Sequence, residues 1–290
     1  MKHRITRKCP VCLEPYASDY RQGTCSPGCA NELKGKYEVA VVLGDVHIPF
    51  EDKRALDLVL NYCESRQPDS IILMGDVLDC YEISDFLKDP ERGLRFPEEV
   101  KEGRRRLEEL RKRCPKARIT YIQGNHEHRL TKYVIRNAGG LRGLDGLSIP
   151  GQLRLEENGI TWIAQDSDKF IDTYISLLGG RLLIGHFDMV RKDSGYTAKG
   201  LLDQYGCSII DGHVHSVGTS NKTLANNKLV MAWENGCLCD LHPHYCHPRK
   251  WMHAFSVVHL PVDGEGHYFH VDHKIIINYS FWDGNVIWRN

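Results

Sequence analysis

Short apolar runs alternate with amphipathic segments through the first half of the chain. The runs at 39–43, 70–74 and 119–122 are rich in Val, Ile and Leu and predict buried strands. Between them, apolar residues recur at helical spacing over 52–65, and residues 97–113 form a charged helix candidate. This alternation predicts β-α-β units with a largely parallel sheet, which is an α/β fold.

The second half of the chain has a different pattern. Two apolar segments flank Gly179-Gly180 and predict a β-hairpin. A short helix is expected over about 196–205. Further strands are predicted at 160–164, 207–210, 229–233 and through most of 254–288, where the last two regions alternate as antiparallel strands do.

Five predicted strands end in a glycine followed by residues of metal-binding types. Ligand sites of open α/β sheets lie beyond the carboxyl ends of the strands, so these clusters are expected at one edge. A single Asp-x-His is more often a solvated loop, but five such strand ends together predict a metal site. The five sequences are Gly-Asp-Val-His (44–47), Gly-Asp-Val-Leu-Asp (75–79), Gly-Asn-His-Glu (124–127), Gly-His (185–186) and Gly-His-Val-His (212–215).

These motifs, in this order, resemble those of the calcineurin-like metallophosphoesterase superfamily over about residues 38–275. The resemblance implies an α/β fold, namely a four-layer α-β-β-α sandwich with two mixed sheets, and a dinuclear metal centre. Imidazole and carboxylate ligands accept Mn, Fe or Zn, of which we favour Mn. The ligands that the resemblance implies are Asp45, His47 and His215 for the first ion, Asn125, His186 and His213 for the second, and Asp76 as the bridge between them.

The resemblance also implies a mechanism, in which a hydroxide bridging the two metal ions attacks phosphorus. His126 matches the catalytic general acid, which protonates the leaving oxygen. Asp79 lies where the family has a carboxylate that orients this histidine, and its alternative role is that of a helix N-cap.

The chain departs from the protein Ser/Thr phosphatases of this superfamily at two positions. Cys80 stands where those enzymes have an Arg that grips phosphate, and Ile48 follows the first motif where they have Gly. The Gly-His-x-His ending is instead typical of the phosphodiesterase and nuclease branches. The resemblance therefore disfavours a protein phosphatase.

Four cysteines near the N-terminus form two close pairs separated by twelve residues. Such pairs can place four thiolates around one Zn²⁺, and the metal would supply the folding energy of so short a segment. We predict one structural Zn in residues 9–29, within a zinc ribbon over 1–36, and a phosphoesterase domain over 37–290. This layout resembles proteins carried by bacteria and their phages. The expected zinc ligands are Cys9, Cys12, Cys25 and Cys29.

Composition and charge restrict the binding partners and the cellular compartment that we expect. The 38 Lys and Arg balance the 38 Asp and Glu, which argues against capture of nucleic acid or membrane by overall charge. The charge is uneven, because residues 1–36 carry a net charge of +4 and the remainder −4. Neither a membrane span nor a secretory signal is expected, and an odd number of 11 Cys then indicates a reducing, cytoplasmic setting.

Two further segments leave alternatives open. Residues 101–118 carry nine Lys or Arg against three Glu, which suits either a track for a phosphate backbone or a solvated helix face. Residues 233–253 are rich in Cys and His, and they predict either a third metal site or a loop over the catalytic edge.

The favoured function is hydrolysis of phosphodiester bonds by two metal ions, with a nucleic acid or nucleotide as substrate and the zinc module as an accessory grip. One alternative is a small-molecule phosphomonoesterase, in which the zinc module is a structural or dimerisation element. The other is a non-catalytic binding protein on a phosphatase scaffold, which the complete ligand set disfavours. The natural substrate and the oligomeric state do not follow from the sequence.

Overall fold

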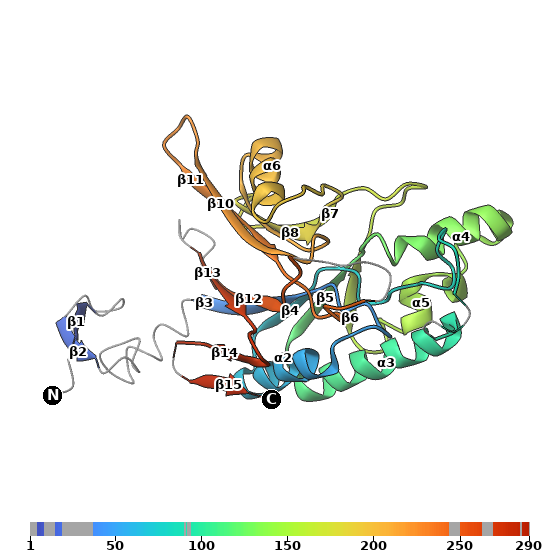
Figure 1. Ribbon diagram of the computed structural model, residues 1–290, viewed down its shortest axis with the longest axis horizontal. Coiled ribbons are helices and arrows are strands. Elements are labelled where there is room, and N and C mark those ends of the chain that lie inside the picture. Colours follow the sequence, from blue (N-terminus) through green and yellow to red (C-terminus); the bar gives the residue numbers. More distant parts are fainter. Residues whose placement is uncertain are drawn as a thin grey trace.

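The structure, a computed structural model, contains two mixed β-sheets that face one another, with helices on their outer faces (Figure 1). This arrangement confirms the predicted α/β class with two mixed sheets. The residues that the structure describes are 5–8, 15–18, 37–89, 91, 94–243, 250–262, 269–284 and 286–289.

The first sheet has six strands in the order β13-β12-β3-β4-β5-β6. The four strands from β3 to β6 are parallel, as the alternation of strands and helices predicts, while β12 and β13 add antiparallel pairs at one side. The strands are β3 (Tyr37–Leu43), β4 (Ser70–Leu73), β5 (Arg118–Ile122), β6 (Ile160–Ile163), β12 (Ala254–Pro261) and β13 (His270–Ile275).

The second sheet has five strands in the order β10-β11-β9-β8-β7. Strands β8, β9 and β11 are parallel, and the two outer strands are antiparallel to their neighbours. The predicted hairpin at Gly179-Gly180 is confirmed, because it joins β7 to β8. The strands are β7 (Thr173–Leu177), β8 (Leu182–His186), β9 (Ser208–Asp211), β10 (Val217–Thr223) and β11 (Leu229–Asn235).

Helices and short segments complete the described fold. The two long helices α2 and α3 lie on the outer face of the first sheet and α6 on that of the second (Figure 1). No helix among the described ranges has the length and apolar character needed to cross a membrane. The elements are α2 (Lys53–Arg66), α3 (Phe96–Arg113), α4 (His128–Ala138), α5 (Ile149–Leu153), α6 (Tyr196–Tyr205), the 3₁₀ turns Gly139–Leu141 and Asp145–Leu147, β14 (Ser280–Trp282) and β15 (Ile287–Arg289).

Strand β3 is apolar over residues 39–43 because both of its faces are covered there. Val41 and Leu43 pack into the cluster formed with the helices of the first sheet, whereas Ala40 and Val42 pack against the second sheet. Successive side chains of a strand point to opposite faces, so a strand between two layers needs apolar residues at every position. The apolar run therefore shows that β3 lies inside the first sheet, covered on both faces. Its carboxyl end lies at the interface of the two sheets.

The basic residues of α3 are held largely by ion pairs and backbone carbonyls. Arg105 lies 2.6 Å from Glu102, and Arg113 lies 2.6 Å from Glu109. Arg111 donates a hydrogen bond of 2.7 Å to the carbonyl oxygen of Ala117. Groups paired in this way satisfy one another at the surface, which favours a solvated helix face over a phosphate track for residues 101–118.

The N-terminal part is described as one antiparallel pair of strands, β1 (Ile5–Lys8) and β2 (Pro15–Ser18). The zinc ligands predicted there lie outside the described residues. The zinc ribbon and its bound ion therefore stay a prediction.

Candidate metal centre

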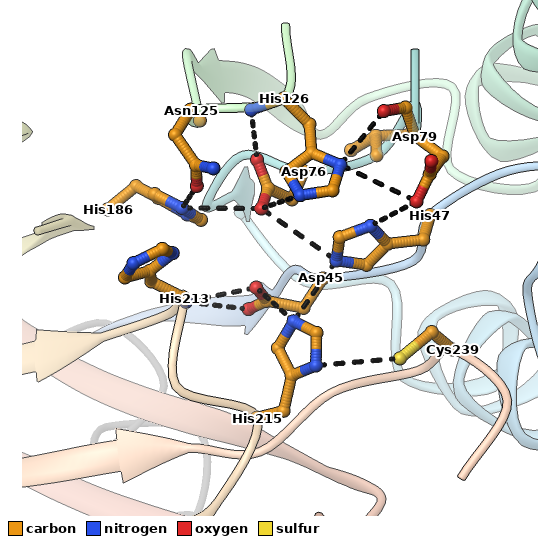
Figure 2. Close-up of polar contacts among 12 residues, drawn as sticks. Asp45, His47, Asp76, Asp79, Asn125, His126, His186, His213, His215 and Cys239 are labelled. Atoms are coloured by element: carbon orange, nitrogen blue, oxygen red, sulfur yellow. Dashed lines mark hydrogen bonds and ion pairs between the residues drawn. The ribbon is translucent and has the colours of Figure 1, made fainter. Parts of the chain in front are cut away.

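Strands of both sheets bring the predicted site residues to one place (Figure 2). The carboxyl ends of β3, β4 and β5 meet those of β8 and β9, since each set of strands is parallel within its own sheet. The expected convergence of the five strand ends is therefore observed, at the interface between two sheets rather than along one. The residues concerned are Asp45 and His47 after β3, Asp76 and Asp79 after β4, Asn125 and His126 after β5, His186 at the end of β8, and His213 and His215 after β9.

One group of potential ligands is formed by Asp45, His47, Asp76 and His215, whose ligand atoms lie within 4.8 Å of one another. Nε2 of His47 is 3.0 Å from Nε2 of His215 and 3.7 Å from a carboxylate oxygen of Asp76. Nε2 of His215 is 3.2 Å from Oδ1 of Asp45. All four residues are buried. Buried imidazole and carboxylate groups aimed at one point form a donor set that suits a divalent cation.

A second group consists of Asp76, His186 and His213, and their ligand atoms also lie within 4.8 Å of one another. Nε2 of His186 is 3.4 Å from a carboxylate oxygen of Asp76 and 2.9 Å from Oδ1 of Asn125. Asp76 belongs to both groups. A carboxylate with two oxygens can contact two ions at once, so this arrangement fits a pair of metal ions that share Asp76.

Five of these residues have a left-handed backbone, which is unusual for residues other than glycine. Such φ values cost free energy and persist where the surrounding structure holds them, often at functional sites. Here they turn the chain sharply as each strand ends, so that consecutive side chains reach the same point. The φ values are 52° for Asp45, 53° for His47, 50° for Asp76, 68° for His213 and 56° for His215.

Asp76 and His213 are held in the charge states that metal binding requires, whereas His215 carries a proton that a metal ion must displace. Burial raises the pKa of Asp76, but the surrounding histidines outweigh this effect and hold that pKa well below its usual range. Burial also lowers the pKa of His213 to about 3, aided by the neighbouring His186. Burial lowers the pKa of His215, but the hydrogen bond to Asp45 outweighs burial and raises that pKa to about 9. A cation bound between Asp45 and His215 would replace that proton.

His126 lies beside the centre with its ring held at both nitrogens. Nδ1 is 2.8 Å from the carbonyl oxygen of Asp79, and Nε2 is 2.9 Å from Nη2 of Arg129. The carboxylate of Asp79 is closer to the other histidine, since Oδ2 is 3.0 Å from Nδ1 of His47 and 3.5 Å from Nδ1 of His126. No helix of the described residues begins between Asp79 and Phe96, so the alternative of a helix N-cap at Asp79 is wrong.

Glu127 is a site residue to which sequence reasoning assigned no role. It is fully buried, and its carboxylate accepts hydrogen bonds from the backbone N–H groups of Asp76, Val77, Leu78 and Gly124. These bonds hold the loop after β4 against the loop after β5, and so fix the position of Asp76. Arg129, the last residue of the run Gly-Asn-His-Glu-His-Arg, was likewise assigned no role. Both residues lie within or just after the Gly-Asn-His-Glu motif, so their position in the sequence already pointed to a place near the metal ligands.

The model of the calcineurin-like phosphoesterase family matches residues 39–235, which is more than half of the chain. The chain belongs to the calcineurin-like phosphoesterase family. Members of this family are metal-dependent phosphoesterases with a dinuclear site, so the buried His and Asp groups described above are metal-site residues of a metallophosphoesterase.

Relatives with similar sequences come from mycobacteriophages. The Gene 54 protein of Mycobacterium phage L5 is 27% identical over 234 residues, which is 78% of this chain and 89% of that protein. The Gene 54 protein of Mycobacterium phage D29 is 26% identical over 233 residues, or 77% and 89% of the two chains. Among solved structures, Vps29 of Entamoeba histolytica in complex with Zn²⁺ has 10% identity and a TM-score of 0.43, covering 84% of this chain and 96% of that chain.

Proposed function

We propose that this protein hydrolyses phosphodiester bonds of a nucleotide or nucleic acid with the help of two divalent cations. The observation that carries the proposal is the sharing of buried Asp76 between two groups of converging ligands. In this proposal Mn²⁺ is the favoured cation. The ligands are assigned as Asp45, His47 and His215 for one ion, Asn125, His186 and His213 for the other, and Asp76 for both.

Two cations held by these residues would lower the pKa of a coordinated water and neutralise charge on the phosphate oxygens. The residues around the centre would then orient the phosphate and supply a proton. Glu127 serves as a positioning residue for Asp76, since its carboxylate accepts the N–H of Asp76 at 2.9 Å.

His126 is assigned to protonate the leaving oxygen. Its Nε2 faces the centre, 3.8 Å from Oδ2 of Asp76, while the hydrogen bond between Nδ1 and the carbonyl oxygen of Asp79 fixes the ring. Burial lowers the pKa of His126, but the carboxylates of Asp76 and Asp79 outweigh it and raise that pKa above its ordinary value. A raised pKa favours the protonated ring that a general acid requires. Nε2 carries that proton only when Arg129, whose guanidinium donates to Nε2 at 2.9 Å, turns to another acceptor such as the phosphate.

The surroundings of Cys80 support a diester rather than a monoester substrate. Cys80 is fully buried, and its backbone N–H donates a 2.6 Å hydrogen bond to Glu99. The position where protein phosphatases place a phosphate-gripping Arg is therefore closed to substrate. A diester carries one negative charge, whereas a monoester carries up to two. Binding of a diester therefore depends less on an additional Arg that neutralises phosphate charge.

An exposed aromatic ring next to Arg129 supports a nucleotide or nucleic acid. The Phe86 side chain is 69% exposed, and the guanidinium carbon of Arg129 lies 5.6 Å from the centre of its ring. Arg129 in turn contacts His126. A base stacked on Phe86 would therefore lie near Arg129, which contacts the residue assigned to protonate the leaving oxygen.

The test is a substrate panel with full-length protein and Mn²⁺. Bis-p-nitrophenyl phosphate should be hydrolysed at least tenfold faster than p-nitrophenyl phosphate, and Asp76→Asn should lose activity on both. Phe86→Ala should raise the KM for a dinucleotide several-fold and leave kcat unchanged, while Leu87→Ala, at a neighbouring exposed position, serves as the matched control. Full activity in Asp76→Asn would refute the assigned chemistry, and a preference for the monoester would favour the small-molecule phosphomonoesterase.

The zinc module over residues 1–36 is proposed as an accessory grip on nucleic acid because of its net positive charge. Deleting it should weaken binding of DNA or RNA and leave hydrolysis of bis-p-nitrophenyl phosphate unchanged. Unaltered nucleic-acid binding by the shortened chain would instead support a structural or dimerisation role.

A further inference from the structure

Two cysteines lie close to His215, and Figure 2 shows one of them, Cys239, on the side of the ring that faces away from Asp45. They are Cys237 and Cys239, in the segment that follows β11. Their sulfur atoms and a ring nitrogen of His215 lie within 4.8 Å of one another, and Sγ of Cys239 is 3.8 Å from Nδ1. All three residues are buried. The two nitrogens of His215 thus face two different groups of potential ligands.

These two cysteines differ from other buried cysteines of the described ranges. Cys63, Cys80 and Cys114 belong to the apolar cluster between the first sheet and its helices. Cys237 and Cys239 belong to none of the three apolar clusters found in the described residues. Leu238, between them in sequence, does pack into the first cluster. A free buried thiol usually fills space in a core, and this pair does not.

The partner of Nδ1 also distinguishes His215 from other histidines of the centre. A metal-ligating histidine normally donates its second N–H to a carboxylate or a carbonyl oxygen. His47 has Asp79 at 3.0 Å, and His186 has the carbonyl oxygen of Met74 at 2.9 Å. The described contact of Nδ1 in His215 is with a sulfur atom, which is a weak hydrogen-bond acceptor and a strong ligand for metals.

The backbone around the two cysteines is held from both sides. The N–H of Cys237 donates a 3.0 Å hydrogen bond to the carbonyl oxygen of Met252. The N–H of Leu238 donates to the carbonyl oxygen of Asp45 at 3.0 Å. Nε2 of His253 is 2.9 Å from the carbonyl oxygen of Cys239. The sulfur atoms are therefore fixed relative to the loop after β3, which carries the first metal ligands.

We propose that Cys237, Cys239 and Nδ1 of His215 form a third metal site, which takes a thiophilic divalent cation such as Zn²⁺. Zinc binds sulfur at about 2.3 Å and nitrogen at about 2.0–2.1 Å, so a tetrahedral site separates these two ligand atoms by roughly 3.6 Å. The distance of 3.8 Å between Sγ of Cys239 and Nδ1 of His215 is close to that value.

Binding there forms two zinc–sulfur bonds and one zinc–nitrogen bond, and releases the two thiol protons and the proton on Nδ1 to solvent. With ions also bound at the dinuclear centre, His215 would bridge the two sites as an imidazolate. A water molecule would complete the four ligands of the zinc ion. The arrangement couples the segment after β11 to the catalytic centre through a single side chain.

The first test measures zinc per chain by mass spectrometry of the metal content. Full-length wild type, the double variant Cys237→Ser/Cys239→Ser and the control Cys207→Ser are each dialysed against Zn²⁺. Cys207 is a buried cysteine of the apolar cluster around α6, and all three proteins keep the N-terminal cysteines. The double variant should lose one equivalent of zinc while the control keeps it. Equal zinc content in wild type and the double variant would overturn the proposal.

The second test needs no variant, so a failure of the double variant to fold does not affect it. Anomalous diffraction at the zinc edge from wild-type crystals should give a peak at bonding distance from both sulfur atoms. A disulfide between Cys237 and Cys239, or zinc at the dinuclear residues with none at the sulfur atoms, would overturn the proposal. Because occupancy is read directly, this outcome is independent of whether the protein hydrolyses phosphodiesters.

Discussion

Glu99 tests how strongly the interior of this protein disfavours an ionised carboxylate. It lies in the first turn of α3 with no exposed surface. Oε1 accepts the N–H of Cys80 at 2.6 Å, while Oε2 is buried and has no hydrogen-bond partner. Burial accordingly raises the pKa of Glu99 from 4.5 to about 8, against the opposing effect of the Cys80 hydrogen bond. The dipole of α3 favours an anion there by only about 0.5 kcal/mol, which is too little to reverse burial.

This raised pKa makes the protein less stable as pH increases. Between the two pKa values the folded chain keeps a proton on Glu99 that the unfolded chain has lost, so rising pH favours unfolding. Each pH unit in that window costs about 1.4 kcal/mol, which amounts to about 3 kcal/mol between roughly pH 5.5 and 7.5. Glu99→Gln removes the ionisation and keeps an oxygen that can accept the N–H of Cys80.

Urea unfolding of wild type and Glu99→Gln at these two pH values measures the effect. The variant should gain about 3 kcal/mol relative to wild type as pH rises, because only wild type loses stability through this group. Glu108→Gln, which makes the same chemical change at an exposed position of α3, should follow wild type at both pH values. Parallel pH profiles of wild type and Glu99→Gln would show that Glu99 ionises freely in the folded protein.

Three further perturbations test the loops around Asp76. Gly124→Ala would force a Cβ into the Asp76 carboxylate and should abolish metal binding measured by calorimetry, whereas Gly140→Ala meets no atom within 4 Å and should leave it unchanged. Glu127→Gln should lower the free energy of unfolding by about 2 kcal/mol and weaken metal binding, because an amide replaces an acceptor of four backbone N–H groups. Tyr121→Phe removes one hydrogen bond to the same carboxylate and should cost only about 1 kcal/mol in urea unfolding.

Much of the fold could be predicted because its signals are local. The apolar runs that became β3, β4 and β5 and the amphipathic segment of α2 carry their periodicity in consecutive residues. Strand β10 (Val217–Thr223) was missed because its sequence is largely polar and exposed. Its partner is β11, with seven residue pairs in register, so it is a strand through pairing rather than through an apolar pattern.

In the candidate site, too, local sequence features could be predicted and contacts between distant residues could not. The residues at the strand ends could be predicted, since a strand direction and a glycine place the next side chains at the sheet edge. The partner of a side chain depends on three-dimensional distance, which the sequence does not contain. Asp79 was expected to orient His126, yet its carboxylate lies closer to His47. The proximity of Cys237 and Cys239 to His215 likewise depends on the pairing of β11 with β9.

Metal removal tests whether the cations contribute to the fold as well as to the proposed reaction. Left-handed backbone at five of the site residues costs at least about 1 kcal/mol each, or roughly 5 kcal/mol in all. That cost is comparable with the entire stability of many domains, which is about 5–15 kcal/mol. A cation present at a thousand times its Kd restores about 4 kcal/mol, because it binds the folded chain alone.

Wild type should therefore unfold at a clearly lower temperature after dialysis against a chelator that strips the metal, and recover when Mn²⁺ is added. Asp76→Asn removes the shared ligand without changing the backbone, so it should show little response to Mn²⁺. Differential scanning calorimetry measures both effects. If wild type and Asp76→Asn gained the same increase in Tm from Mn²⁺, the cations would be stabilising the protein somewhere other than at the strained strand ends.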